Sequence, residues 1–453
     1  MDREETEQAA APTIFPKRAQ ELAIVYCYRK RSCLESSYSY RQPIELIIVT
    51  ASFFRRSLVG KIIATAVVGC TLLPSLAVEQ EMPLDYRLNE QIIMLPAGIG
   101  KQAMLETTVF KPNGPGPFPL LVINHGKESG EPRRQTRDRF IYMATAFVKR
   151  GYAVMLPMRQ GFSRSSGRYL DFGCDMTANG YAQASDVLDT IDYARGMRWV
   201  DDTRILVAGQ SYGGLATVAL GTQAVPGVRG LLNFAGGLRD DADACDWRGA
   251  LVAAFAHYGA NNKIPSLWMY GANDSLFDPA LVGRMHAAFV GMGGRARRAE
   301  LGVFKRDAHG MAASRDGEKF WWRDTERFLE QIGMPTREIH TVAAAPVLPR
   351  SNFAEIGDID AIPYLGENGR AAYRAYLGKM TPRAFALSPS GAWCWAEEGE
   401  QPDVRALETC AEKSNGPCTL YSVDDYVVWP NSVGSSTAES QPPVVAPTQT
   451  AQQ

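Results

Sequence analysis

The sequence predicts a doubly wound α/β domain with a mostly parallel sheet, followed by a small disulfide-containing module near the C-terminal end. Two observations carry this prediction. Between residues 84 and 333, short apolar runs alternate with longer segments of helical periodicity. Glycine turns follow several of those runs, as expected for loops at the carboxyl edge of such a sheet. The composition, 45% hydrophobic and 21% charged, is ordinary for a globular protein.

The region before this domain has the pattern of an export signal. Residues 1–54 lack a core pattern, and we interpret them as a non-native or disordered extension, with the natural start downstream of Met1. In residues 55–77, basic side chains precede an apolar segment that ends in Ser75-Leu76-Ala77, as in a secretory signal peptide. We expect cleavage near Ala77 and a secreted or periplasmic protein. An uncleaved membrane anchor and lipoprotein processing at Cys70 stay open as alternatives.

The elements of the main domain follow in order along the chain. We predict strands at 118–124, 152–157, 205–208, 228–234, 264–270 and 301–304, and helices at 140–150, 181–197, 215–219, 279–290 and 317–332. Trp321 and Trp322 in the last helix are predicted core residues. Residues 236–262 interrupt the alternation, and we predict a small cap there.

The segment Gly209-Gln210-Ser211-Tyr212-Gly213-Gly214 lies between a predicted strand and a predicted helix. This order of strand, sharp turn and helix is that of a nucleophile elbow, which exposes its central serine above the sheet. The flanking glycines leave room for the strand and helix to approach each other. Ser211 is therefore the candidate nucleophile.

A serine needs a histidine base and a carboxylate that orients it. Of the five histidines, His309 in Asp307-Ala308-His309-Gly310 lies on a loop between a predicted strand and helix, and is the candidate base. Asp274 follows the strand at 264–270 and is the first-choice acid, since the order Ser, Asp, His is then kept. The second choice is the acidic loop of Asp240, Asp241, Asp243 and Asp246.

Backbone N–H groups near Ser211 would stabilise an oxyanion. We assign one to Tyr212, which follows the serine, and the second to Lys127, with its neighbour Gly126 as the alternative, because both follow the early strand at 118–124. The loop at 159–167 lies at the same sheet edge. Its Arg159 and Arg164 are candidates for binding a substrate carboxylate, and a solvated loop is the equal alternative.

Taken as an ordered set, these motifs resemble the α/β-hydrolase superfamily, and within it dienelactone hydrolase-like and prolyl oligopeptidase-like serine hydrolases. The resemblance spans residues 84–333 and implies the α/β-hydrolase fold with Ser211, Asp274 and His309 as the triad. Two departures qualify it: dienelactone hydrolases proper use a cysteine nucleophile, and no propeller-length segment precedes this domain.

The predicted function is an exported serine hydrolase that cleaves carboxylic esters through an acyl-enzyme. A peptidase acting on short peptides is the alternative, and a non-catalytic binding protein on the same fold is the rival of another class. The net charge of −1 and the absence of a basic stripe, P-loop, dinucleotide fingerprint or metal-ligand cluster give no sign of nucleic acid, metal or cofactor. We expect a small-molecule ester or short peptide as the partner and no membrane span after processing.

Five of the eight cysteines follow residue 77. Cys174 and Cys245 are predicted to pair because both lie on loops at the edge that carries the site, and Cys410 and Cys418 are close enough in sequence to close a short loop. Cys394 is then unpaired. After a linker at 334–355, residues 356–429 are expected to form the small module, and 430–453 a disordered tail rich in Ser, Pro, Thr and Gln.

Overall fold

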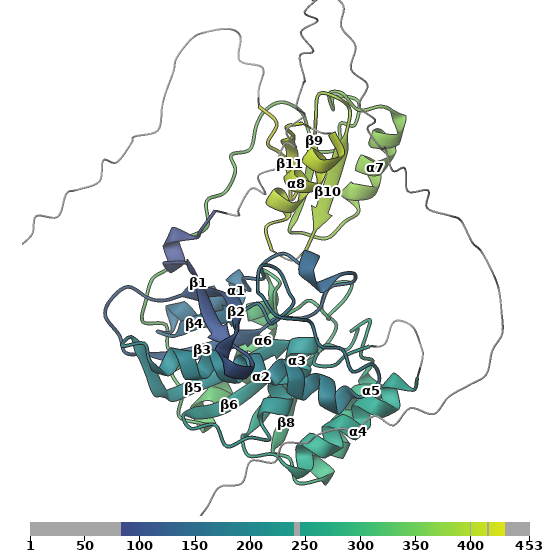
Figure 1. The fold of residues 1–453 in the computed structure, drawn as a ribbon. Coiled ribbons are helices and arrows are strands. Elements are labelled where there is room, and N and C mark those ends of the chain that lie inside the picture. Colours follow the sequence, from purple (N-terminus) through teal and green to yellow (C-terminus); the bar gives the residue numbers. More distant parts are fainter. Residues whose placement is uncertain (1–82, 240–244, 399, 415, 431–453) are drawn as a thin grey trace, which may run out of the picture. The chain divides into compact units, whose positions relative to one another are not determined.

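The structure is a computed structural model that describes residues 83–239, 245–398, 400–414 and 416–430 (Figure 1). The predictions for residues 1–54, for the signal peptide at 55–77 and for the tail from residue 431 onward lie outside the described residues. The described residues all lie within one compact unit.

The main domain is built on an eight-stranded sheet with the strand order β1-β2-β4-β3-β5-β6-β7-β8 (Figure 1). The strands β3 to β8 run parallel, whereas β2 is antiparallel to both β1 and β4. The predicted doubly wound, mostly parallel sheet is confirmed. The strands are β1 (Gln91–Ala97), β2 (Ala103–Phe110), β3 (Phe118–Asn124), β4 (Ala153–Pro157), β5 (Val200–Gln210), β6 (Val228–Phe234), β7 (Ser266–Tyr270) and β8 (Ala296–Glu300).

Helices cover both faces of this sheet. In β3, whose seven residues are all buried, Leu120 and Val122 join one apolar cluster while Leu121 and Ile123 join the other. Alternate side chains of a strand point to opposite faces, so each cluster is the core on one face. The first cluster includes α2 (Met176–Arg195), α3 (Tyr212–Leu220), α4 (Trp247–Ala260) and α5 (Pro279–Gly291), and the second includes α1 (Ile141–Lys149) and α6 (Gly317–Gln331).

Two predictions about this domain are wrong. The described part of the predicted cap is not a separate element: α4 connects β6 to β7 and contributes Leu251 and Phe255 to the first core cluster, while residues 240–244 lie outside the described residues. The last strand is Ala296–Glu300, while 301–304 is loop. Among the described strands, β8 pairs with β7 alone and lies at the edge of the sheet, so it can carry the charged side chains that hid it from the apolar pattern.

Residues after 350 form a smaller structure with its own sheet and core. Its antiparallel sheet has the order β10-β9-β11-β12, with strands β9 (Arg383–Leu387), β10 (Trp393–Glu397), β11 (Thr419–Val423) and β12 (Tyr426–Val427), and helices α7 (Glu367–Leu377) and α8 (Pro402–Ser414). Tyr373 and Tyr376 of α7 pack against Phe385 of β9. The strands β10 and β12 were not anticipated from the sequence.

Both predicted disulfides are present. Cys174 pairs with Cys245 and Cys410 pairs with Cys418, while Cys394 is a buried free thiol. The second bridge joins α8 to the residue before β11, so it closes this part of the small sheet covalently.

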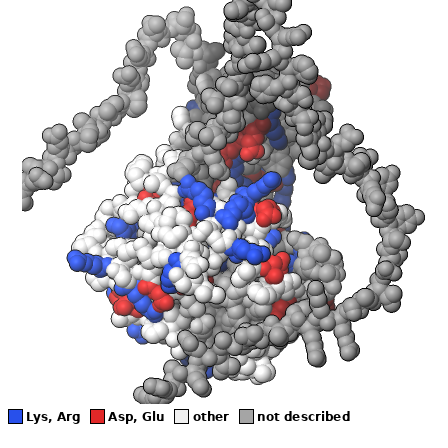
Figure 2. Space-filling model, in the orientation of Figure 1, with Lys and Arg blue, Asp and Glu red and all other residues white. Residues whose placement is uncertain are grey.

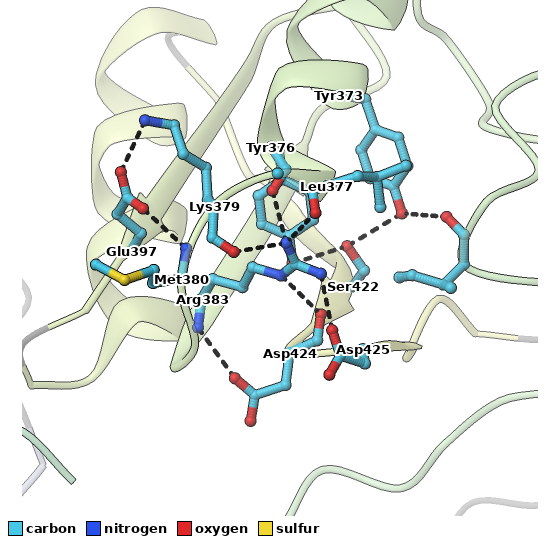
Figure 3. A network of polar contacts seen from close by, with 12 residues as sticks. Tyr373, Tyr376, Leu377, Lys379, Met380, Arg383, Glu397, Ser422, Asp424 and Asp425 are labelled. Atoms are coloured by element: carbon cyan, nitrogen blue, oxygen red, sulfur yellow. Dashed lines mark hydrogen bonds and ion pairs between the residues drawn. The ribbon is translucent and has the colours of Figure 1, made fainter. Parts of the chain in front are cut away.

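One arginine organises the small structure (Figure 3). Arg383 is 5% exposed, and its guanidinium donates hydrogen bonds to backbone carbonyls at the end of α7 and beyond, and to the turn between β11 and β12. The acceptors are the carbonyls of Tyr376, Leu377, Lys379 and Asp424 and the carboxylate of Asp425. Orphan carbonyls of a helix terminus need such partners when they are buried.

On the face seen in Figure 2, positively and negatively charged side chains are mixed: Lys and Arg are interspersed with Asp and Glu. Within the described part of the chain, none of the helices is both long enough and apolar enough to cross a membrane.

Replacing Arg383 tests this arrangement. Arg383→Met leaves several buried carbonyls without a donor, and we expect the free energy of unfolding of this small structure to fall by about 3 kcal/mol. Hydrogen exchange read on peptides from residues 356–429 measures the change locally. Arg374→Met on the exposed face of α7 is the matched control, expected to cost less than about 0.5 kcal/mol. Equal effects of the two substitutions would contradict the assignment.

Candidate active site

Ser211 lies in a strained turn between β5 and α3. Its backbone angles are φ 56° and ψ −123°, a conformation that residues with a side chain rarely adopt. The first turn of α3 packs closely against the end of β3: a Cβ on Gly213 would lie 2.2 Å from the carbonyl oxygen of Asn124 and 2.5 Å from that of His125. The predicted strand, turn and helix are therefore confirmed, and only glycine fits at position 213.

The loop after β3 lies directly against the serine. A Cβ on Gly126 would lie 3.4 Å from Ser211 Cβ and 2.9 Å from Gln210 Oε1, and Lys127 lines the same pocket as Ser211. Among the described residues, the N–H groups of Lys127 and Tyr212 have no hydrogen-bond acceptor. The Tyr212 N–H is one of the free donors at the start of α3. The structure thus brings the three predicted donor residues to the serine.

Asp274 and His309 form a hydrogen-bonded pair. His309 Nδ1 lies 3.1 Å from Asp274 Oδ1 and 3.2 Å from Oδ2. The backbone N–H groups of Leu276 and Phe277 each donate to Asp274 Oδ1 over 2.9 Å, and Asp274 is 6% exposed. These donors fix the carboxylate, so the imidazole that contacts it is fixed as well. Asp246, from the second-choice group, instead caps α4 through Gly249, while residues 240–244 lie outside the described residues.

The residues on either side of Asp274 also contact the loop that carries His309. The Asn273 side chain donates to the carbonyls of Phe304 and Lys305, and the Ser275 hydroxyl donates to Asp307 over 2.6 Å. Three consecutive residues of one loop therefore contact the other.

Asp307 connects these two loops to the histidine backbone. Its Oδ1 accepts from the N–H of His309 over 2.9 Å and from the N–H of Ser275 over 3.1 Å. Burial raises the pKa of the Asp307 carboxyl, but the hydrogen bonds from Ser275 and His309 outweigh it, and the pKa lies below its ordinary value. Asp307 was part of a sequence motif without a role, and the structure supplies that role: it holds the backbone of His309.

The His309 loop is held from a third side as well. Lys305 donates to the carbonyl of Thr381 over 2.7 Å and forms ion pairs with Asp316 and Glu398 at 3.3 and 3.4 Å. Arg315, after the histidine, pairs with Asp424 at 2.9 Å. Residues on both sides of His309 are therefore bound to the C-terminal part of the chain.

Gln210 connects the serine turn to the histidine loop. Its Nε2 donates to the carbonyl oxygen of His309 over 2.9 Å, while its Oε1 faces Gly126. In the described part of the chain no hydrogen bond joins Ser211 Oγ directly to His309. Such bonds are often long in ligand-free sites and tighten when substrate binds. Gln210 occupies a variable position of the elbow pattern, which is why the sequence did not single it out.

A cavity of about 360 Å³ opens over Ser211. Apolar side chains and four charged ones of both signs line it, so its charge does not favour one substrate sign. The lining includes Lys127, Glu128, Tyr169, Asp171, Met176, Tyr212, Leu238, Arg239, Leu276 and Phe277. Gly173, which also lines it, precedes the disulfide-bonded Cys174, so the Cys174–Cys245 bridge fixes one wall of the cavity.

The two arginines predicted to bind a substrate carboxylate do not line this cavity. Arg159 is fully buried and donates to Gln183 and to the carbonyl of His125. Arg164 pairs with the buried Glu106, with 2.6 Å between Nη2 and Oε1. Both arginines therefore have intramolecular partners, and the expectation that they bind substrate is corrected. His257 and His286 lie on α4 and α5 and do not belong to the site.

No group of three or more His, Cys, Asp or Glu side chains suited to a metal ion occurs among the residues that the structure describes.

Comparison with known proteins gives a family match for part of the chain. Residues 101–263 match the model of the X-Pro dipeptidyl-peptidase (S15 family). No match was found among the curated proteins.

Several solved structures are distantly similar. A protein named as a dienelactone hydrolase from Klebsiella pneumoniae is 16% identical, with 54% of this chain and 98% of that chain covered and a TM-score of 0.39. An acylaminoacyl peptidase from Pyrococcus horikoshii is 18% identical, with 56% and 43% covered and a TM-score of 0.41. An esterase from Pyrococcus furiosus is 13% identical, with 55% and 96% covered and a TM-score of 0.40.

The strand order itself assigns the fold. An antiparallel second strand, a serine elbow after β5, an acid after β7 and a histidine after β8 are the arrangement of the α/β-hydrolase fold. Together with the family match, this arrangement confirms the resemblance to the α/β-hydrolase superfamily that the sequence predicts.

Asp307→Asn tests the link between the acid and histidine loops. The variant keeps the side-chain shape but loses a charged acceptor. We expect the free energy of unfolding at pH 7 to fall by about 1 kcal/mol, a modest loss because solvent partly screens the Asp307 carboxylate. Because the folded-state pKa is lowered, the contribution is present above the ordinary carboxyl pKa and is lost as the pH falls through the folded-state pKa.

Thermal melts of both proteins from pH 8 to pH 3 measure this difference. We expect the difference in stability between the two proteins to be constant between about pH 6 and 8 and to shrink below about pH 4. Asp202→Asn, an exposed residue near the start of β5, is the control. A difference that persists unchanged at the lowest pH would contradict the ionised role of Asp307.

Proposed function

We propose that this protein is a serine hydrolase that cleaves carboxylic esters through a covalent acyl-enzyme. The observation that carries the proposal is the strained Ser211 turn, which opens into a cavity beside a hydrogen-bonded Asp274–His309 pair. Fold alone would not support an activity, because this fold hosts many functions. The proposal rests on the site residues.

Each residue has a defined role in the proposed reaction. Since His309 Nδ1 donates to Asp274, its Nε2 is the free nitrogen that takes the proton from Ser211 as the oxygen attacks the ester carbonyl. The N–H groups of Tyr212 and Lys127 stabilise the oxyanion of the tetrahedral intermediate. His309 then protonates the leaving alcohol, and a water activated by the same imidazole releases the acid from Ser211.

A peptidase is the second candidate, favoured by the match to the X-Pro dipeptidyl-peptidase family. The match includes Ser211 and the oxyanion loop but ends before Asp274 and His309. The same groups would cleave a peptide bond, with the amine as the leaving group. A non-catalytic binding protein on this fold is the third possibility, and the complete set of Ser211, Asp274 and His309 weighs against it.

We also propose export, with cleavage near Ala77. Two features support it: the signal-like segment at 55–77 and the two disulfides, which form in oxidising compartments. Mass analysis of the processed protein from the producing cell tests this proposal, and a chain that keeps residues 55–77 would contradict it.

Covalent labelling is the direct test of the catalytic serine. A fluorophosphonate probe should label wild-type protein at Ser211, label Ser211→Ala not at all, and label His309→Ala far more slowly. For ester hydrolysis we expect kcat to fall about 10⁴-fold or more in Ser211→Ala, His309→Ala and Asp274→Asn, because triad members act as a unit.

His257→Ala is the matched control, since His257 lies on α4 away from the site. Its labelling rate should equal that of the wild type. A folded wild-type protein that is neither labelled nor active on any ester or peptide would leave the binding role as the conclusion.

A pair of substrates with the same acyl group separates the two enzyme candidates. We expect p-nitrophenyl acetate and butyrate to be hydrolysed with kcat/KM at least about 10³-fold above that of the corresponding anilides, a difference of about 4 kcal/mol in transition-state stabilisation. Ala-Pro-p-nitroanilide tests the family match directly. Faster cleavage of this dipeptide amide than of the esters would overturn the esterase proposal in favour of the peptidase.

A further inference from the structure

A buried guanidinium contacts the loop that carries Lys127, one of the two proposed oxyanion donors. Arg159 follows β4 and is 0% exposed. Its Nε donates to Gln183 Oε1 over 2.7 Å, its Nη1 to the carbonyl oxygen of His125 over 2.6 Å, and its Nη2 to that of Gly126 over 3.4 Å. Two consecutive carbonyls of the loop are thus held by one side chain.

The planarity of the peptide bond transmits this hold to the donors. In a trans peptide the C=O and the following N–H point in opposite directions. The carbonyl of His125 shares its peptide plane with the N–H of Gly126, and the carbonyl of Gly126 shares its plane with the N–H of Lys127. Fixing both oxygens on Arg159 therefore directs both N–H groups away from it. Ser211 lies next to Gly126, and Ser211 and Lys127 line the same pocket.

His125 completes the clamp. Its Nε2 accepts the backbone N–H of Arg159 over 3.0 Å, so the ring proton lies on Nδ1, which donates to the carbonyl of Gly126 over 2.6 Å. Burial, and after it the charge of Arg159, lowers the pKa of His125 well below its ordinary value, and the ring stays neutral. The Gly126 oxygen thus accepts from two donors, both of which depend on Arg159.

The charge of Arg159 is not neutralised by direct contact. Among the described residues no carboxylate lies within ion-pair distance of it, and the nearby Asp186 accepts from Gln160 N and Nε2 over 2.7 and 2.6 Å. Burial lowers the pKa of Arg159 to about 10, so the guanidinium is still charged at neutral pH. A buried charge with only neutral acceptors is costly, and it polarises the peptide groups to which it donates.

We propose that Arg159 is a positioning residue for the oxyanion hole: by holding the carbonyls of His125 and Gly126, it orients the peptide that carries the Lys127 N–H, the donor proposed to act with the Tyr212 N–H on the oxyanion formed at Ser211. This inference rests on the proposed serine hydrolase function. It also gives a role to the arginine that the sequence analysis placed in substrate binding. Arg159 itself is fully buried and does not line the pocket, so it acts through the loop and not on the substrate.

The test uses Arg159→Lys and Arg159→Met in the full chain, with Arg164→Lys as the matched control. Arg164 is on the same loop, and its pairing with Glu106 tolerates a lysine ammonium. Lysine keeps the charge at position 159 but cannot donate to three acceptors in one plane. We expect KM for p-nitrophenyl butyrate within about 3-fold of wild type and kcat lowered about 10²-fold, as when an oxyanion donor is lost.

A thionoester of the same acyl group gives a readout that general loosening would not move. Its tetrahedral intermediate places charge on sulfur, which accepts hydrogen bonds weakly, so it gains little from the two N–H groups. The ratio of kcat/KM for the oxoester to that for the thionoester should fall about 10-fold or more in the Arg159 variants, consistent with a weakened oxyanion hole. It should stay at the wild-type value in Arg164→Lys.

Equal losses on both esters, or kcat within 3-fold of wild type in both Arg159 variants, would overturn the inference. If neither Arg159 variant folds, Gln183→Met decides, because it frees the guanidinium Nε while leaving Arg159 in place. A lowered oxoester preference in Gln183→Met supports the role and an unchanged preference rejects it. An inactive, unlabelled wild-type protein would instead reject the serine hydrolase proposal, so the two failures are distinct.

Discussion

The close approach of the first turn of α3 to the end of β3 is the constraint on which the candidate site depends. The backbone at Gly213 lies against the carbonyls of Asn124 and His125, so no side chain fits between them. This approach sets the serine turn against the oxyanion loop and leaves Ser211 with φ 56°. The strain at Ser211 is maintained because residues 205–209 of β5 and the whole of α3 are buried on either side of it.

From this contact the remaining parts of the site are connected by hydrogen bonds rather than by regular structure. Gln210 reaches from the serine turn to the carbonyl of His309, and Asp307 reaches from the amide of His309 to Ser275 beside Asp274. The serine, histidine and acid loops therefore form a continuous network. Loops at the carboxyl edge of a sheet can vary in sequence, so such polar links are what fixes their geometry.

The sequence predicts the fold well where local pattern and tertiary position agree. The apolar runs of β3 to β7 are buried on both faces, and the elbow pattern includes the residues that its geometry requires, so Ser211, Asp274 and His309 could be placed in order.

Prediction from the sequence failed where tertiary contacts determine the structure. The charged edge strand β8 lacks an apolar run, β1 and β2 gave no clear alternation, and Arg159 looked like a loop arginine although the fold buries it completely. Gln210 and Asp307 form hydrogen bonds with residues that are 99 and 32 positions away, which no local pattern can reveal.

The His309 loop shows why the residues after 350 matter to the site. Between β8 and α6 this loop has no helix or strand of its own, so its order depends on side-chain contacts. Asn273 and Ser275 contact the loop from the acid side. On the C-terminal side, Thr381 and Glu398 contact its Lys305, and Asp424 contacts its Arg315. A histidine base must be held within a fraction of an ångström to take a proton efficiently. The C-terminal structure thereby contributes to the geometry of the base through contacts and not through a reacting group. Arg383, which organises its core, is connected to the histidine loop in this way: its backbone N–H donates to the Asp424 carboxylate that also pairs with Arg315.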